Sequence, residues 1–357
     1  MTPSSVSSGF LSPRRVARAV LAVALAVGAV YLVSRRAGME PREIVGLVLS
    51  LLALGLLLLP LPALLSGRGV RSLKAWVDGR PLRAAALPAV LLVPCLVYWS
   101  IPGVATLAGI LRLVLYIGVP SLLAVVLPRG RLRLVGDTLV VLCIWLPVEL
   151  RLLVASFPWP HGSTGSFLMS PLGLDLLLYL MLVARGFDPQ GLTLRVGARD
   201  VASATGSFAA FAAVGVPIGL RTGFLIFGVH DGAPLFGLAA GLVILIFTGL
   251  PEEVLFRGFI QTTLVRCTGR PLVGLVVASL VFGAAHLDNG PHAPDWRYGV
   301  LATLAGLAYG WVYLRTRRIL APAIAHTLAS TVLYHFLPPE ITHFMRVGPG
   351  FFGTGGS

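Results

Sequence analysis

Residues 234–268 read PLFGLAAGLVILIFTGLPEEVLFRGFIQTTLVRCT, an apolar run that leads into two adjacent glutamates and then into an arginine. The part from 234 to 250 carries no charged side chain, and a helix of about 20 such residues spans a lipid bilayer. Two carboxylates at membrane depth are costly unless they are paired or functional. The stretch therefore predicts a membrane helix that carries a polar site.

The composition extends this interpretation to the whole chain. Of 357 residues, 56% are hydrophobic and 12% are charged, and the mean hydropathy is +0.89. Soluble domains carry about 25% charged residues, and disordered chains have low hydrophobicity, so both classes are excluded. Ten further apolar runs begin near residues 16, 44, 84, 104, 134, 167, 201, 271, 298 and 319. They are continuous, whereas the strands of a β-barrel alternate over about ten residues. We predict an all-α polytopic membrane protein with about eight to eleven transmembrane helices.

The net charge of +14 comes mainly from arginines in short clusters between the apolar runs. Such clusters lack the basic stripe with interleaved aromatics that reads nucleic acid, so no nucleic-acid partner is expected. The basic connections are 66–83, 128–133 and 185–200, and they alternate with two connections that carry no arginine cluster. By the positive-inside rule the basic connections are cytoplasmic, although Arg35, Arg36 and Arg42 depart from the alternation. We expect a multi-pass protein in the lipid bilayer of the cell membrane.

The chain divides by composition into five parts. Residues 1–13 are polar and small, which predicts a disordered tail, and residues 14–184 form an N-terminal transmembrane region. Its first run reads as a retained helix in preference to a signal peptide, because no clear small-residue cleavage site follows. Residues 185–200 are a polar linker, residues 201–340 form the functional core, and residues 341–357 form a flexible tail.

Glu252, Glu253 and Arg257 are the first candidate site residues. Glu253 and Arg257 are four residues apart, so on a helix they share a face and can form an ion pair. Glu252 points elsewhere and remains free to accept a proton, which is how paired acids acquire different roles. The alternative is a helix start at Pro251, with acids near the positive helix end and a local salt bridge.

Two histidines and a serine complete the set of candidates. His286 closes the run LVFGAAHL, and His326 lies within an apolar helix, with Ser330 four residues later on the same face. Each histidine alone could be a hydrogen-bonded packing residue. Together with the glutamates they provide what hydrolysis by water needs, either through a metal bound by histidine and carboxylate or through direct activation of water. Ser330 or a histidine is a candidate donor for an oxyanion.

These three segments resemble the CPBP family, the intramembrane proteases that include the type II CAAX prenyl protease. That family carries EExxxR, FxxxH and HxxxN or HxxxD; this chain has EEVLFR at 252–257, FGAAH at 282–286 and HTLAS at 326–330. The resemblance covers residues 234–336. Ser330 departs from the usual Asn or Asp, and a serine reaches less far.

The resemblance implies an intramembrane endopeptidase that cleaves a membrane-anchored protein or peptide. Glu252 would be the general base, and Glu253 with Arg257 would be the supporting pair. His286 would join water activation or metal binding, and His326 would bind metal or stabilise the oxyanion. A zinc ion (Zn²⁺) held by Glu253, His286 and His326 is one expectation, and a metal-independent glutamate mechanism is the other.

A geometric difficulty accompanies this interpretation. If the run 234–250 is a complete span, strict alternation places Glu252 and His286 on opposite membrane faces. A shared site requires either that residues 252–268 themselves cross or enter the membrane or that the number of spans differs by one from this count. The rival functions are a membrane scaffold or immunity-type protein, in which these residues only hold helices together, and a transporter with a proton relay.

Overall fold

The computed structural model describes residues 28–29, 31–36, 38–128, 133–158, 166–189, 191–226, 240–289, 293–334 and 337. Within these ranges the chain is helical without a strand, and five helices are long and apolar enough to cross a membrane. The predicted all-α polytopic fold is therefore confirmed. The predicted tails 1–13 and 341–357 lie outside the described residues, and the helix count and the five-part division stay predictions.

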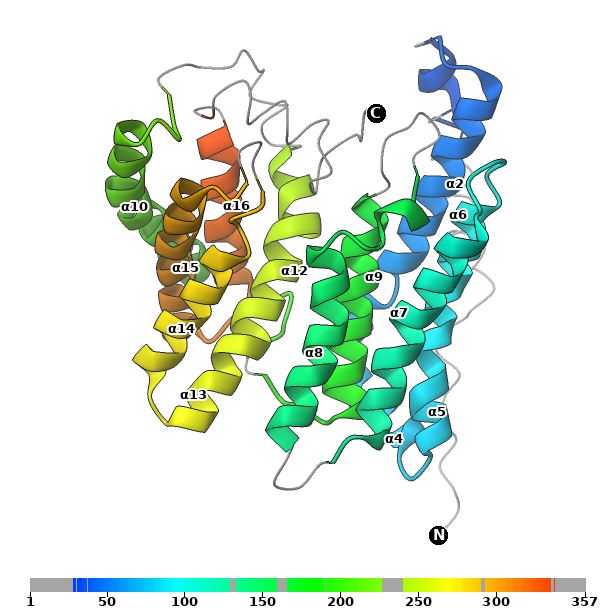
Figure 1. Ribbon diagram of the computed structural model, residues 1–357, viewed down its shortest axis with the longest axis horizontal. Helices are drawn as coiled ribbons and strands as arrows, with labels where there is room; N and C mark the ends of the chain where they lie inside the picture. The colour runs from blue at the N-terminus through cyan, green and yellow to red at the C-terminus, as the bar shows by residue number, and fades with distance from the viewer. Residues whose placement is uncertain are drawn as a thin grey trace.

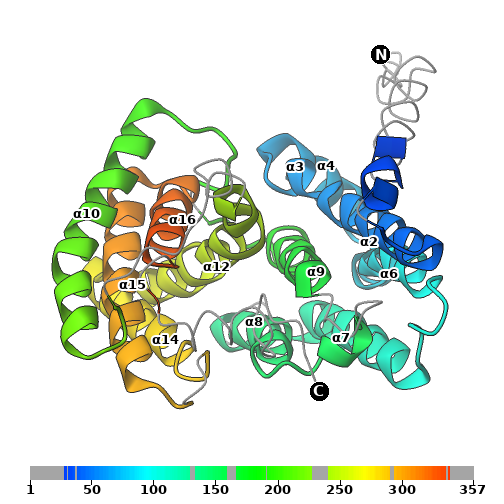
Figure 2. The same ribbon diagram turned by 90° about the horizontal axis from the view of Figure 1, so that it is seen from above.

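The N-terminal region is a group of helices around one central member (Figures 1 and 2). Its elements are α2 (Pro41–Leu58), α3 (Leu61–Leu64), α4 (Gly67–Val77), α5 (Pro81–Ala86), the 3₁₀ turn η1 (Leu87–Leu91), α6 (Leu92–Trp99), α7 (Leu107–Val126), α8 (Arg133–Glu149), the 3₁₀ turn η2 (Val154–Ser156) and α9 (Ser166–Leu178). A π-helical segment, η3 (Tyr179–Ala184), continues α9. The apolar span Phe167–Ala184 is 83% buried, against 39% or less for the other long spans, so α9 is the interior helix.

The C-terminal region is a second group, beside the first (Figure 2). It contains α10 (Ala198–Arg221), the π segment η4 (Leu245–Gly249), α12 (Leu250–Glu253), the π segment η5 (Val254–Gln261), α13 (Thr262–Thr268), α14 (Pro271–Ala284), α15 (Trp296–Thr316) and α16 (Leu320–Tyr334). α10 lies on the outside against α15 and α16, and only 17% of its apolar span is buried. This outer helix therefore presents most of its surface to lipid.

The difficulty over Glu252 is resolved by one long helix. Residues 240–268 are helical without a break, so the apolar run does not end at Leu250, as the sequence suggested, but continues through the glutamates. At 1.5 Å per residue this helix is about 40 Å long, with Glu252 near its middle. Gly269 then adopts the left-handed conformation that ends helices, and Pro271 starts α14 in the opposite direction. α14 thereby returns the chain to the level of Glu252 at His286.

Pro251 lies inside this long helix and has no N–H to donate to the carbonyl of Phe247, four residues earlier. The hydroxyl of Ser170 on α9 donates to that carbonyl instead, at 2.6 Å. An unpaired carbonyl at membrane depth would cost several kcal/mol. This bond therefore joins the interior helix of the N-terminal region to the helix that carries the glutamates.

Arginine-rich connections meet at one end of the molecule. Arg266 donates to the carbonyl of Asp188, and Arg318 forms an ion pair of 2.9 Å with Asp200. Nearby, the buried Arg185 forms a 2.6 Å ion pair with Asp137 and donates to carbonyls at the end of α7. The basic connections of both regions are thus held together, as the alternation of charge in the sequence predicts.

Candidate active site

The centre of the candidate site is a buried ion pair. Arg257 Nη1 lies 3.0 Å from Glu253 Oε1, and Arg257 Nε lies 3.0 Å from Glu253 Oε2. The two residues are 1% and 0% exposed. Arg257 also donates to the carbonyl of Gly306 at 3.0 Å, and its guanidinium lies 4.6 Å from the ring centre of Phe282. The four-residue spacing therefore gives the expected ion pair, which fixes Glu253 in the interior.

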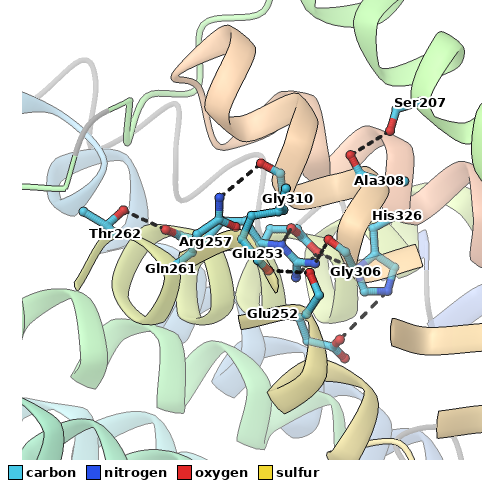
Figure 3. Close-up of polar contacts among 12 residues, drawn as sticks. Ser207, Glu252, Glu253, Arg257, Gln261, Thr262, Gly306, Ala308, Gly310 and His326 are labelled. Carbon is cyan, nitrogen blue, oxygen red and sulfur yellow. Dashed lines mark hydrogen bonds and ion pairs between the residues drawn. The ribbon is translucent and has the colours of Figure 1, made fainter. Parts of the chain in front are cut away.

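His326 connects this pair to the second glutamate (Figure 3). Its Nδ1 lies 3.0 Å from Glu253 Oε1, and because a carboxylate only accepts, Nδ1 carries the donated proton. In a neutral imidazole this leaves the lone pair on Nε2, which lies 3.9 Å from Glu252 Oε2. Tyr309 stacks on the His326 ring at a centroid distance of 5.0 Å and an interplanar angle of 15°. The imidazole is thus held from one edge and one face.

Glu252 has a different environment from Glu253. Its side chain is 22% exposed, whereas that of Glu253 is fully buried. Its Oε2 atom has no hydrogen-bond partner among the described residues. Adjacent carboxylates with such different surroundings are expected to have different roles, one fixed in an ion pair and one available to accept a proton.

His286 lies on another side of the same cavity. Its Nδ1 is 2.8 Å from the carbonyl of Phe282, four residues earlier, and must donate to it. A neutral His286 therefore carries its lone pair on Nε2. The ring of Phe282 contacts both imidazoles, at centroid distances of 4.5 Å to His286 and 5.7 Å to His326. The FxxxH spacing thus places one phenylalanine between the two histidines.

These side chains surround one cavity of about 850 Å³. Glu252, His286, His326 and Ser330 line it, whereas Glu253 and Arg257 lie beneath its wall. Ser330 is half-buried, and no hydrogen bond to it is found in the described part of the chain. The structure therefore brings the candidate residues together from the long helix, from the end of α14 and from α16.

Several lining residues were not anticipated from the sequence. They are Tyr298 and Tyr309 on α15, Asn289 after α14, and Trp145, Glu149 and Arg151 from the N-terminal region. Tyr298 contacts the ring of His286 at 5.2 Å between centroids. None of these residues belongs to a spaced motif, so only a prediction of helix packing could have found them.

The zinc expectation can be tested against the donor atoms. Both oxygens of Glu253 face Arg257, and Oε1 also accepts from His326. The remaining lone pairs belong to Glu252, His286 and His326, but no three such residues are close enough for a metal site within the described ranges. The set Glu253, His286 and His326 does not fit a zinc ion in this arrangement. Zinc binding stays a prediction, and we derive no step through a metal.

A charged pair outside the spanning segments positions the loop after His286. Asp295 accepts from the backbone N–H of Arg297 at 3.0 Å and from its side chain at 2.9 and 2.8 Å. The hydrogen bond from the Arg297 side chain is the main reason that the pKa of Asp295 is lowered. The backbone N–H of Asp295 also donates to the carbonyl of Leu287 at 2.8 Å. The start of α15 is thereby tied to the residue that follows His286.

The arrangement is that of a membrane protein with a glutamate and two histidines in a cavity within its helices. Comparison with known proteins identifies this class more closely. Residues 234–332 match the family described as type II CAAX prenyl endopeptidase Rce1-like. The protein named "Putative membrane peptidase YdiL" from Bacillus subtilis (strain 168) is 29% identical over 106 residues, which are 30% of this chain and 38% of that protein. No solved structure was found to match the chain.

These matches and the three motifs make residues 234–332 similar to the CPBP family. The matched segment contains every candidate site residue, from Glu252 to Ser330. Most of the N-terminal region lies outside it. The long apolar helices make this a multi-pass membrane protein, and its C-terminal part is similar to a family of membrane endopeptidases.

Proposed function

We propose that this protein is an intramembrane endopeptidase of the cell membrane that hydrolyses a peptide bond in a membrane-anchored or membrane-inserted substrate. The observation that carries the proposal is the arrangement of Glu252, whose side chain, 22% exposed, lines the cavity with His326 Nε2 3.9 Å from its Oε2. A buried cavity of this kind receives substrate most directly from the bilayer.

The nucleophile in this mechanism is a water molecule between Glu252 and His326. A separation of 3.9 Å is spanned by one water at about 2.8 Å from each atom with an angle near 90°. Such a water donates one proton toward the carboxylate and one toward the Nε2 lone pair. Glu252 takes a proton as the water oxygen attacks the carbonyl carbon, and it then returns that proton to the departing amine.

The surrounding residues hold the reacting groups in place. The Glu253–Arg257 pair fixes the His326 ring through Nδ1, so that Nε2 remains an acceptor that faces Glu252. His286 Nε2 provides a second acceptor in the same cavity. The Ser330 hydroxyl is the proposed donor to the oxyanion, and its short reach requires the scissile carbonyl to lie close to α16.

The test is the Glu252→Gln variant, which keeps the shape of the side chain but removes its basicity. Purified protein in detergent is incubated with a mixture of peptides that carry a membrane anchor, and products are identified by mass spectrometry. We expect cleavage to fall by about 10² to 10⁴, the contribution of a general base, while stability changes by less than about 1 kcal/mol. Asp288→Asn, which alters an exposed acid outside the cavity, is the matched control and should cleave normally.

Two outcomes would contradict the proposal. Cleavage by Glu252→Gln at the wild-type rate would remove Glu252 from the mechanism. No cleavage by the wild-type protein, combined with unfolding of Glu252→Gln, would favour a scaffold whose charged residues only hold helices together.

A further inference from the structure

We infer that the cavity opens toward the arginine-poor, non-cytoplasmic face of the membrane, so that this enzyme acts on substrate segments that reach the site from that side. The part of this inference that concerns substrates rests on the proposed function. The direction of the opening rests on charge and geometry alone.

The two ends of the molecule differ in charge. At the end where α4, α5 and α13 lie (Figure 1), the connections 66–83, 185–197, 266–271 and 315–319 each carry two or more basic residues. Contacts hold the last three of these at the same level, since Arg266 donates to the carbonyl of Asp188 and the N–H of Ile319 donates to the carbonyl of Gly191.

At the opposite end the described connections are poor in basic residues. Residues 100–106 carry none, 150–158 carry Arg151, 221–226 carry Arg221, and 285–289 with 293–297 carry Arg297. The stretch 35–42 before and at the start of α2 is the exception, with three arginines. The other described connections at this end carry at most one basic residue each, and by the positive-inside rule the arginine-rich end is cytoplasmic.

The cavity occupies the half of the molecule near the arginine-poor end. On the long helix and α15 its lining residues run from that end only as far as Phe256 and Tyr309. On α8 the lining begins at Val141 and continues past the helix end to Arg151. No residue of 257–281 or 310–325 lines it.

The floor of the cavity supports the same direction. Below the level of Glu252, the fully buried Glu253–Arg257 pair closes the space toward the cytoplasmic end. At the other end Arg151, in a left-handed backbone conformation (φ 57°), donates to the carbonyl of Asp288 at 2.9 Å. A non-glycine residue in this conformation carries a cost that its surroundings must offset. This contact joins the N-terminal and C-terminal regions beside the cavity-lining Asn289.

The substrate class follows from the direction of the opening. The scissile bond would lie in a segment on the non-cytoplasmic side, such as the outer flank of a transmembrane helix or an exported peptide that remains in the membrane. A substrate segment that lies only on the cytoplasmic side could not enter the cavity, because the Glu253–Arg257 pair closes it at that end.

Cysteine labelling in intact cells tests the direction directly. The chain has a natural marker at the arginine-rich end in the exposed Cys267. In a Cys95→Ala, Cys143→Ala background, one variant keeps Cys267. Two others replace it with alanine and carry Asp288→Cys or Ser100→Cys, at exposed positions of the opposite end. Each is treated with a membrane-impermeant maleimide before and after permeabilisation of a bacterial expression host.

We expect Asp288→Cys and Ser100→Cys to label fully in intact cells and Cys267 to label only after permeabilisation. The reverse pattern would overturn the inference, even if peptide cleavage is confirmed. The second arm adds the peptides that carry a membrane anchor, each made impermeant by a highly charged soluble segment, to right-side-out and inside-out vesicles, with Glu252→Gln as the blank. Cleavage confined to right-side-out vesicles supports the inference, and cleavage confined to inside-out vesicles overturns it. Absence of cleavage in both would reject the proposed function while the labelling result still decides the direction.

Discussion

Substitution of the two adjacent glutamates should have different effects: Glu253→Gln should lower the stability of the protein, whereas Glu252→Gln should lower its activity with little change in stability. Glu253→Gln leaves the buried guanidinium of Arg257 without its counter-charge and weakens the bond to His326 Nδ1. Glu252→Gln changes a side chain that is 22% exposed and whose Oε2 has no partner in the described part of the chain. The two variants thus make the same chemical change at consecutive positions in different surroundings.

The expected magnitudes follow from burial. Removing one partner of a buried ion pair costs about 3–5 kcal/mol, because the other charge remains desolvated. We expect Glu253→Gln to lose that amount of unfolding free energy and Glu252→Gln less than about 1 kcal/mol. Removing both charges in Glu253→Gln/Arg257→Met should cost less than the sum of the two single variants, by about 2–3 kcal/mol.

The assay is denaturant-induced unfolding of the purified protein in detergent, followed by tryptophan fluorescence, on the wild type, the three single variants and the double variant. Activity is measured on the same samples. The reasoning is refuted if Glu253→Gln is as stable as Glu252→Gln, or if the effects of Glu253→Gln and Arg257→Met simply add. Either result would mean that the pair makes no net contribution to the buried centre.

Three further predictions use the same unfolding assay. Ser170→Ala leaves the Phe247 carbonyl without its donor and should destabilise the protein by about 1–3 kcal/mol; an unchanged midpoint would mean that this bond is dispensable. Arg185→Met leaves the buried Asp137 with the partly exposed Arg133, 3.4 Å away, as its remaining ion-pair partner in the described part of the chain. It should cost up to about 3–5 kcal/mol, whereas a loss below about 1 kcal/mol would place the pair with exposed salt bridges. The pKa of Asp295 is lowered by hydrogen bonds from Arg297, so its stabilisation is complete above the unfolded pKa of about 3.9 and is lost as the pH falls further. Stability should therefore fall more steeply below about pH 4 in the wild type than in Asp295→Asn, and identical profiles would contradict this.

Much of the fold was predictable because membrane helices are determined by local composition. The apolar runs near residues 44, 104, 167 and 201 correspond to described helices, because a helix in lipid must satisfy its own backbone groups and needs a continuous apolar surface. The ion pair between Glu253 and Arg257 was predictable for the same reason, since it depends only on helical spacing.

The cavity wall was not predictable in this way. Glu149 and Arg151 approach the site because α8 and α9 pack against the long helix, and nothing in their local sequence distinguishes them from other residues at helix ends. The end of the run at Leu250 was also misjudged. Pro251 and the glutamates resemble a helix start, but Ser170 replaces the lost hydrogen bond and allows the helix to continue.

The site depends on both regions of the chain, although the family match covers only one. The matched segment 234–332 provides the glutamates, the histidines and Ser330. The N-terminal region provides Ser170, which completes the backbone of the helix beside the glutamates, and the opposite cavity wall, which includes Trp145. Trp145 packs edge-on against Phe256 at 5.6 Å between centroids. Without this wall, Glu252 would face acyl chains, where a carboxylate is costly and water is scarce. In the proposed mechanism, the N-terminal helices would therefore keep Glu252 and the histidines away from lipid and accessible to water at the depth of the bilayer, which hydrolysis in a membrane requires.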